Sequence, residues 1–269
     1  MNKKIGIENN KITKTHEFLA FVMNLSTTVK IIALSLVLII TIWLVFFPGL
    51  IPYLNVKLNY DSIDKKIQDY QYYDVKCPDD YIEYSEYGIT LKAPHGLEIK
   101  ETEYNDEIVY ANSKNDLELE LTFYKPVEQK LTFNKGDIIL NEKQFQAFCD
   151  DTNIIYPTSN YERNVIIRNL TFDDFNVHDA ELADIFLKLA EWKEWDQPYG
   201  NDWYYFNGEN FRGLLYDYCG LPSYDGECCI VLWLYPQDNP DTEYMVRVKT
   251  DKATAANIIA TIGIDKKAY

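Results

Sequence analysis

The feature that most constrains this chain is an uncharged, strongly apolar run near its N-terminus. From Ile31 to Val56 there is no charged residue, and most of the run reads IIALSLVLIITIWLVFFPGLIPYL. A helix needs about 20 apolar residues to cross the roughly 30 Å hydrocarbon core of a bilayer. We therefore predict a single transmembrane helix over residues 31–54, with the lipid bilayer as its partner.

A cleaved signal peptide and a buried helix of a soluble protein are the alternatives for this run. The apolar region of a signal peptide is roughly 7–15 residues long and is followed by a cleavage site with small residues. Here the run is longer, a tail of residues 1–30 precedes it, and Phe46-Phe47-Pro48-Gly49-Leu50 offers no such site. These differences favour an uncleaved anchor.

The lysines of the tail predict its orientation. Within the nearest 20 residues the lysines on the two sides of the run balance, but the whole tail carries five against two glutamates: Lys3, Lys4, Lys11, Lys14 and Lys30. Short segments rich in Lys and Arg remain on the cytoplasmic side of a membrane. We expect a single-pass plasma-membrane protein with residues 1–30 cytoplasmic and the C-terminal domain outside.

The charge balance excludes one broad class of function. The chain has 26 Lys and Arg against 42 Asp and Glu, a net charge of −16. Without the five lysines and two glutamates of the tail, 21 basic and 40 acidic residues remain. Nucleic-acid binding depends on clustered Lys and Arg, so we expect no nucleic-acid partner. An acidic outer domain favours cationic partners, or serves solubility alone.

Residues 55–80 lie between the apolar run and the first clear strand. Apolar side chains recur there at helical spacing and predict a juxtamembrane helix or linker: Tyr60, Ile63, Ile67 and Tyr70. Cys77-Pro78 ends that pattern. We therefore expect the folded outer domain to cover residues 81–269.

Alternating apolar residues predict strands in the first part of this domain, over residues 88–92, 97–100, 107–110 and 116–123. In the last of these, leucines alternate with polar, mostly acidic residues, which is typical of an antiparallel strand with one face in the core and one in water. Two acidic residues on the polar face, Glu118 and Glu120, are expected to pair with lysines of neighbouring strands, Lys92 and Lys100, rather than to act as an acid–base pair.

The second part of the domain predicts helices and a meander of strands. A helix begins at Asn141 as its N-cap, and a longer one covers residues 177–195 after Asn176. Asn207-Gly208 is a strong hairpin signal. Further strands and a closing helix follow, over residues 211–219, 228–235, 243–249 and 251–262. The expected class is α+β, a central antiparallel sheet packed by helices.

The domain opens with Tyr87-Gly88-Ile89-Thr90-Leu91, followed by Pro94 and Gly96, and its closing strand and helix end on Ala260-Thr261-Ile262. This pattern of elements, over residues 81–264, resembles the PsbP-like superfamily. The resemblance implies a central antiparallel sheet between helices and a non-catalytic binding or assembly role. It transfers no functional residue, and an apolar helix stands where bacterial lipoproteins of that superfamily carry a lipid-bearing cysteine.

Motifs of the common catalytic classes are missing. The sequence has no phosphate-binding loop, dinucleotide fingerprint, zinc-protease helix or nucleophile elbow. His95 and His178 are interpreted as turn and helix-start residues. Asp174 to Asp179 begins like a calcium loop, but it has His at the fifth position and lacks glycine at the sixth, so helix capping explains it better. We expect no cofactor and no metal, and the pattern argues against an enzyme.

Aromatic residues concentrate between Trp192 and Phe206. Strand alternation sends residues 203 and 205 to one face and residues 204 and 206 to the other. One set belongs to the core, and the other is either an exposed platform for sugar rings or is buried under a helix. The candidate ligand-binding residues are Trp192, Trp195, Trp203, Tyr205 and Asp202.

The five cysteines show no Cys-x-x-Cys spacing, which disfavours a zinc or thioredoxin-like site. Cys219 and Cys228 flank the loop between two predicted antiparallel strands. A disulfide between them is one interpretation, and burial as small apolar side chains is the other. An oxidised pair would agree with a location outside the cytoplasm.

Three hypotheses for function follow. In the first, a membrane-anchored, non-catalytic extracytoplasmic domain binds an unknown envelope component or protein partner. In the second, a cell-envelope protein binds or hydrolyses glycans with the region between Trp192 and Phe206. In the third, a membrane assembly factor acts through the span itself. The anchor and the missing catalytic motifs favour the first.

Overall fold

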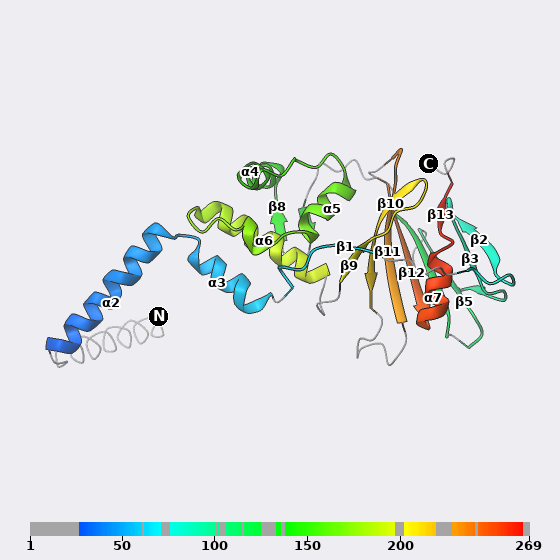
Figure 1. Cartoon of the computed structure of the whole chain (residues 1–269), viewed down its shortest axis with the longest axis horizontal. Coiled ribbons are helices and arrows are strands. Elements are labelled where there is room, and N and C mark those ends of the chain that lie inside the picture. The colour runs from blue at the N-terminus through cyan, green and yellow to red at the C-terminus, as the bar shows by residue number, and fades with distance from the viewer. Residues whose placement is uncertain are drawn as a thin grey trace, which may run out of the picture.

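The computed structural model describes residues 27–60, 62–70, 76–100, 102, 106–114, 116–124, 133–135, 138–196, 202–218, 228–239 and 242–265. Three parts follow one another in Figure 1: a long helix that stands apart, a layer of helices, and a large sheet with its own cover. The mixed helix and sheet content confirms the predicted α+β class.

The apolar run forms two helices rather than one. Helix α2 covers Thr27–Phe46 and α3 covers Leu50–Asn59, so the expected bounds 31–54 cross the turn between them. A residue before proline is disfavoured in the helical conformation, which explains why α2 ends ahead of Phe47-Pro48. Pro52 lies in the first turn of α3, where a missing N–H costs nothing. Helix α2 is long and apolar enough to cross a membrane.

Eight strands form the main sheet, in the order β1-β9-β10-β11-β12-β6-β5-β4. Their bounds are β1 Gln68–Asp69, β4 Glu98–Lys100, β5 Glu107–Ala111, β6 Glu118–Tyr124, β9 Trp203–Tyr205, β10 Phe211–Asp217, β11 Cys228–Pro236 and β12 Glu243–Thr250. All neighbours are antiparallel except β1 and β9, which are parallel. The predicted meander is confirmed as β9 to β12, and the hairpin around Asn207-Gly208 uses a longer loop than two residues.

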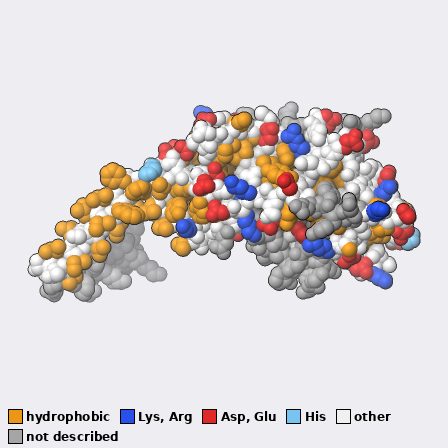
Figure 2. Space-filling view, viewed as in Figure 1, with side chains coloured by type: hydrophobic (Ala, Val, Ile, Leu, Met, Phe, Trp, Pro, Cys, Tyr) orange, Lys and Arg blue, Asp and Glu red, His pale blue; other side chains and the backbone are white. Residues whose placement is uncertain are grey.

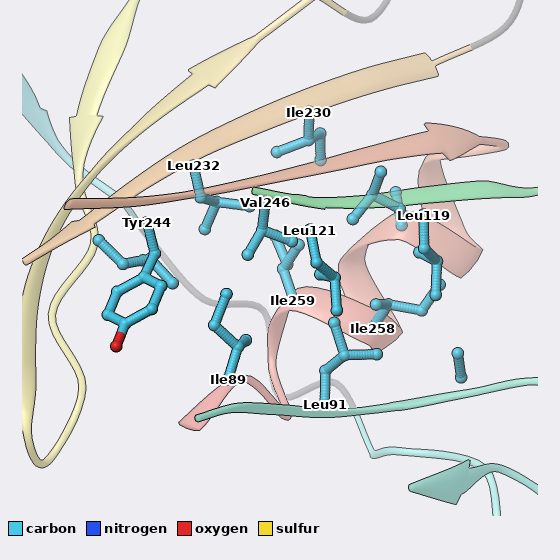
Figure 3. Packing of buried hydrophobic residues seen from close by; sticks show 14 of the residues in the cluster. Ile89, Leu91, Leu119, Leu121, Ile230, Leu232, Tyr244, Val246, Ile258 and Ile259 are labelled. Atoms are coloured by element: carbon cyan, nitrogen blue, oxygen red, sulfur yellow. The ribbon is translucent and has the colours of Figure 1, made fainter. Parts of the chain in front are cut away.

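One face of the main sheet is covered by α7 (Lys252–Ile259) and by a small sheet of β13 (Gly263–Ile264), β3 (Ile89–Ala93) and β2 (Ile82–Glu86). Figure 3 shows side chains from these elements converging between the layers. We call this cluster the apolar core; it includes Ile89, Leu91, Leu119, Leu121, Ile230, Leu232, Tyr244, Val246, Ile258 and Ile259. Alternation along each strand explains which residues enter it.

The opposite face of the sheet meets the helical layer, made of α4 (Glu142–Thr152), α5 (Asn160–Arg168), the 3-10 turn η1 (Phe172–Asp174) and α6 (Ala180–Asp196). Leu214 and Tyr216 alternate with Leu215 and face Tyr161 of α5 in a second buried cluster. Helix α6 packs on α3, α4 and α5. A short hairpin of β7 (Phe133–Lys135) and β8 (Ile138–Leu140) adjoins α6.

The helix starts agree with the sequence in one case and differ in another. Asn141 caps α4: its Oδ1 accepts from the Gln144 amide at 3.0 Å, and the Gln144 side chain returns the bond to the Asn141 amide. Helix α6 begins three residues later than expected, because Asp179 rather than Asn176 caps it. The Asp179 Oδ1 accepts from the amides at 181 and 182. The sequence pattern does not predict α5.

The segment expected as a juxtamembrane helix is not helical after Asn59 in the residues described. Residues 62–64 form a turn and residues 68–69 form β1 at the edge of the main sheet. Ile63 and Ile67 are nevertheless buried. The folded part of the chain therefore includes residues that we expected to lie outside it.

The acidic face of β6 is only partly as expected. The Lys100 Nζ lies 3.2 Å from a Glu118 carboxylate oxygen, as predicted. Glu120 is buried and pairs with Arg247 at 2.5 Å, whereas Lys92 belongs to the small sheet. Burial raises the pKa of the Glu120 carboxyl, while the Arg247 guanidinium opposes that shift. The prediction is wrong for Glu120 because β12 and β5 flank β6 at this position, and they place Arg247 and Val109 opposite Glu120.

Candidate functional site

A cleft of about 580 Å³ opens on the helical layer, beside the turn between α2 and α3. Its lining comes from the end of α4, from η1 and from the loop before α6: Asp151, Thr152, Asn153, Asp173, Asp174, Phe175, Asn176, Val177 and His178. We call it the acidic cleft, because three lining side chains are carboxylates and none is Lys or Arg. Such a surface favours cationic or hydrogen-bond-donating groups.

Hydrogen bonds hold two of these carboxylates in place. The Asn176 Nδ2 donates to both oxygens of Asp151, at 3.1 and 3.3 Å. The Asp174 Oδ2 accepts from the amide and the hydroxyl of Thr171, at 2.8 and 3.1 Å. No group of three or more His, Cys, Asp or Glu side chains within the described ranges is placed to hold a metal ion. In this stretch Asp174 takes part in the capping box of η1 and Asp179 caps α6, whereas Asn176 caps neither.

The wall of the acidic cleft is joined to the end of the apolar helix. The Gly49 amide donates to the Val177 carbonyl at 2.9 Å. The His178 Nδ1 lies 3.1 Å from the Phe46 carbonyl oxygen, and its ring centroid lies 5.0 Å from that of Phe47. These contacts connect the last turn of α2 directly to the loop that precedes α6.

Glycine is required at the turn between α2 and α3. A Cβ at Gly49 would lie 2.7 Å from the Ala183 Cβ and 3.0 Å from the Val177 carbonyl oxygen. Both distances are shorter than ordinary contacts, and a carbonyl oxygen belongs to the backbone and cannot rotate away. The turn is therefore pressed against α6 rather than separated from it by solvent.

A buried lysine ties the segment after α3 to the helical layer. Lys193 of α6 is 1% exposed, and its Nζ donates to the carbonyls of Ile63, Lys65 and Leu170 at 2.7, 2.5 and 2.7 Å. An ammonium group has three donors, and all three are used here. Burial lowers the pKa of Lys193 to about 8, against the opposing effect of the Asp64 carboxylate.

Further hydrogen bonds hold the same segment. The Asn169 Oδ1 accepts from the Ile67 amide at 2.9 Å, while its Nδ2 donates to the Tyr205 hydroxyl at 3.0 Å. The Asp64 Oδ1 accepts from the Phe172 amide at 3.0 Å. We call residues 62–69, together with Lys193 and Asn169, the buried joint, after its buried members Ser62, Ile63, Ile67 and Lys193. It connects the apolar helices, the helical layer and the edge of the sheet.

A second buried cation lies between α5 and the sheet. The Arg168 guanidinium carbon lies 4.0 Å from the centre of the Trp203 ring, a cation–π distance. The Arg168 Nη1 donates to the Asn164 Oδ1 at 2.9 Å, and the Asn164 Nδ2 donates to the Tyr235 hydroxyl at 2.9 Å. Burial lowers the pKa of Arg168 to about 10. This network orients α5 on the sheet.

The predicted aromatic platform is not exposed where the structure describes it. Trp192 is 7% and Trp203 is 3% exposed, and they belong to two different buried clusters. Trp203 lies under Arg168, and Trp192 lies in the helical layer. The side chain of Trp195 falls outside the described residues. A stacking surface for sugars needs accessible rings, which neither Trp192 nor Trp203 offers.

The other two candidate residues take part in contacts of the buried joint. The Tyr205 ring is half-buried, and its hydroxyl accepts a hydrogen bond from Asn169. An Asp202 oxygen lies 3.5 Å from the Lys65 Nζ, in a partly exposed ion pair. The structure thus brings Tyr205 and Asp202 together with Trp203 near one edge of the sheet, in contacts that hold the fold.

The predicted disulfide stays a prediction. Cys219 and the side chain of Cys228 lie outside the described residues. Cys77, Cys149 and Cys229 are free thiols. Burial raises the pKa of Cys149 and of Cys229 to about 11, so neither is a reactive thiolate at neutral pH.

Lys193 and Arg168 were not singled out by the sequence. For Lys193 a usable signal exists, because it follows Leu189 by four residues on a helix whose buried stripe includes Ile185 and Leu189. A lysine at such a position is expected to be buried and satisfied by local acceptors. For Arg168 no comparable signal exists, because α5 itself is not predicted.

No protein-family model matches this chain, and no curated protein matches it. The resemblance to the PsbP-like superfamily therefore stays a prediction.

Proposed function

We propose that this chain is a single-pass membrane protein whose C-terminal α+β domain is a non-catalytic binding module outside the cytoplasm. Residues 1–30 form the cytoplasmic tail, and the acidic cleft is where the domain receives a cationic or hydrogen-bond-donating group of its partner. The observation that carries the proposal is the apolar helix α2, whose 20 residues are all unburied.

The exposure of α2 argues against a core helix. A helix of 20 residues is about 30 Å long, which equals the hydrocarbon thickness of a bilayer. A helix from the core of a soluble protein would be buried on at least one face, and α2 has no buried residue. Water is an unfavourable environment for such a surface, whereas lipid is favourable.

The turn after α2 supports an uncleaved anchor. Cleavage at the end of the apolar run would cut between Phe46 and Leu50, where the Gly49 amide bonds to Val177 and the ring of Phe47 packs on His178. A signal peptide is instead followed by a cleavage site with small residues, which residues 46–50 do not provide. The close contacts of this turn favour retention of α2 in the mature protein.

Membrane placement is tested by fractionation and protease protection of the full chain in cells. We expect the chain to stay in membranes after alkaline carbonate, with an N-terminal tag protected and the domain digested from outside. Replacing Leu38 and Ile39 by lysine costs about 5–7 kcal/mol of insertion energy and releases the chain. The matched control, Leu38→Ala with Ile39→Ala, stays inserted. Release of the unmodified chain, or a protected domain, contradicts the proposal.

Binding at the acidic cleft is tested by thermal unfolding of the full chain in detergent with polyamines, divalent cations and envelope glycan fragments. A ligand at 100 times its Kd stabilises the folded state by about 2.7 kcal/mol. We expect a cationic ligand to raise the midpoint and Asp173→Asn to reduce that shift. Asp184→Asn, on α6 outside the cleft lining, is the matched control. Turnover of any of these compounds would contradict the non-catalytic assignment.

A further inference from the structure

Helix α3 has apolar side chains on two opposite sides. One side packs into the helical layer, where the Tyr53 ring lies 5.6 Å from that of Phe172 and 5.3 Å from that of Phe175. Val56, on the same side, is fully buried. The other side carries Ile51, Leu54 and Leu58, whose exposed fractions are 65%, 46% and 77%. We call these three residues the outer stripe.

The spacing of the outer stripe makes it a continuous surface. Residues at i, i+3 and i+7 fall on one face of a helix, so the three side chains form a row along its length. Beside this row, the Asn59 Nδ2 donates to the Asn55 Oδ1 at 2.6 Å. These two polar side chains therefore bond to each other within α3. A folded domain rarely leaves such an apolar row in water unless it has a partner.

The connection to α2 indicates which partner covers the outer stripe. Only residues 47–49 separate the two helices, and Gly49 is held against α6, so α3 stays close to the end of the span. Figure 1 shows α3 running across the direction of α2 rather than along it, with α6 beyond it. Figure 2 shows the hydrophobic surface of α2 continuing onto the helix that follows. With α2 upright in a bilayer, α3 lies along the bilayer surface.

We propose that α3 is an interfacial helix whose outer stripe inserts into the phospholipid leaflet at which α2 emerges, docking the helical layer on the membrane. This inference rests on the proposed membrane anchor. Lys57 is compatible with the assignment: it is exposed on α3 between Tyr53 and the outer stripe, and its Nζ lies 3.4 Å from the Tyr53 hydroxyl. A lysine at the edge of an apolar row can keep its stem on that surface and its charge among the headgroups.

Docking of α3 on the membrane depends on insertion of apolar side chains among the acyl chains and not on the charge of the lipid headgroups. The part of the chain after the apolar run has 21 basic and 40 acidic residues, and an excess of negative charge is repelled by anionic headgroups. The nearby acidic cleft adds to this repulsion. A bilayer of phosphatidylcholine, which has no net charge, is therefore expected to be sufficient for insertion of the outer stripe.

The test uses the full chain reconstituted in phosphatidylcholine vesicles, with a photoreactive diazirine amino acid at one position at a time. The test position is Leu58, at the far end of α3. The matched control is Ile99 on β4, an aliphatic residue that is 65% exposed and lies on the edge strand at the other end of the main sheet. The control for the span is Leu44 on α2. Lipid adducts are measured by mass spectrometry.

We expect lipid adducts at Leu58 and Leu44, with about tenfold less at Ile99, because an inserted side chain is surrounded by acyl chains. Adducts at Leu44 with as few at Leu58 as at Ile99 would overturn the interfacial assignment and leave the anchor standing. Adducts at neither Leu44 nor Leu58 would overturn the membrane anchor and the assignment together.

Discussion

The two faces of the main sheet are stabilised in different ways. Behind one face, the apolar core brings together side chains such as Leu121, Leu232 and Ile258, which need only fill space. Behind the other face, Lys193 and Arg168 are buried and donate directional hydrogen bonds. Lys193 donates to three backbone carbonyls, and Arg168 donates to the Asn164 Oδ1. Hydrophobic burial is non-directional, so packing behind the first face depends on the size and shape of the side chains and not on particular hydrogen bonds. Behind the second face, the hydrogen bonds of Lys193 fix the position of the segment after α3.

The largest effect is expected from Lys193→Met, which keeps the volume of the side chain but removes the three donors. The carbonyls of Ile63, Lys65 and Leu170 then lose their shared partner, at a cost of about 4 kcal/mol in the free energy of opening the buried joint. Hydrogen–deuterium exchange of the full chain in detergent measures this cost. We expect faster exchange over residues 62–69 and little change in β10 to β12.

The matched control is Lys188→Met on the same helix. Lys188 lies 2.9 Å from the Asp184 carboxylate in a partly exposed ion pair, and such pairs contribute about 0–1 kcal/mol. Equal exchange in the Lys193 and Lys188 variants would show that the joint does not depend on the buried ammonium.

A slightly smaller but global effect is expected from Leu232→Ala in the apolar core. Leu232 is fully buried and faces Val246 across the strand pair, so the substitution leaves a cavity and costs about 3 kcal/mol of unfolding free energy. Denaturant unfolding monitored by circular dichroism measures the loss. Here exchange should increase across β6, β11 and β12 alike; an increase confined to residues 62–69 would erase the distinction between the two faces.

The pH dependence of stability is expected to differ between the unmodified chain and the Lys193→Met variant. Burial lowers the pKa of Lys193 from 10.5 to about 8, so between these values the unfolded state binds more protons than the folded state. Stability from this group is therefore lowest below pH 8 and rises with pH. The difference in unfolding free energy between the two proteins should grow by about 2 kcal/mol from pH 8 to pH 10.

Unfolding midpoints of both proteins across this pH range provide the measurement. Tyrosines such as Tyr235, whose pKa is raised by burial, are common to both proteins and cancel in the difference. A pH-independent difference would mean that Lys193 remains fully charged in the folded state throughout.

The smallest effect is expected from Asp202→Asn. Its ion pair with Lys65 is partly exposed at 3.5 Å, and pairs of this kind contribute about 0.5 kcal/mol. Denaturant unfolding at low and high salt should show a loss that salt removes. A loss as large as that of Lys193→Met would place Asp202 among the essential residues of the buried joint.

The apolar core was largely predictable from the sequence, because each of its strands alternates. Leu119 and Leu121 enter the core and Glu118 does not, as period-two spacing requires. The closing helix was equally clear: Asp251 caps it and Ala255, Ile258 and Ile259 face the sheet. In these elements the local pattern and the tertiary environment agree.

The buried joint was not predictable, because its partners are distant in sequence. The spacing of Tyr60, Ile63 and Ile67 indicated a helix. However, the Ile63 carbonyl accepts from Lys193 and the Ile67 amide donates to Asn169, each more than 100 residues away. Regularly spaced apolar residues indicate that a segment is buried on one side. Over so few residues they do not distinguish a helix from an extended segment. The break of the apolar run at Pro48 was visible as a proline, but the close contact of Gly49 with α6 was not.

The tight turn at Gly49 also sets how far the domain can reach. A flexible tether of 20 residues would let a domain wander by roughly 25 Å from its attachment point. Here residues 47–49 are held by Val177 and His178, so there is almost no slack. If α2 is the proposed membrane anchor, the domain cannot search for a partner at a distance, and encounters would depend on lateral diffusion of the whole molecule and on partners that come close to the anchor.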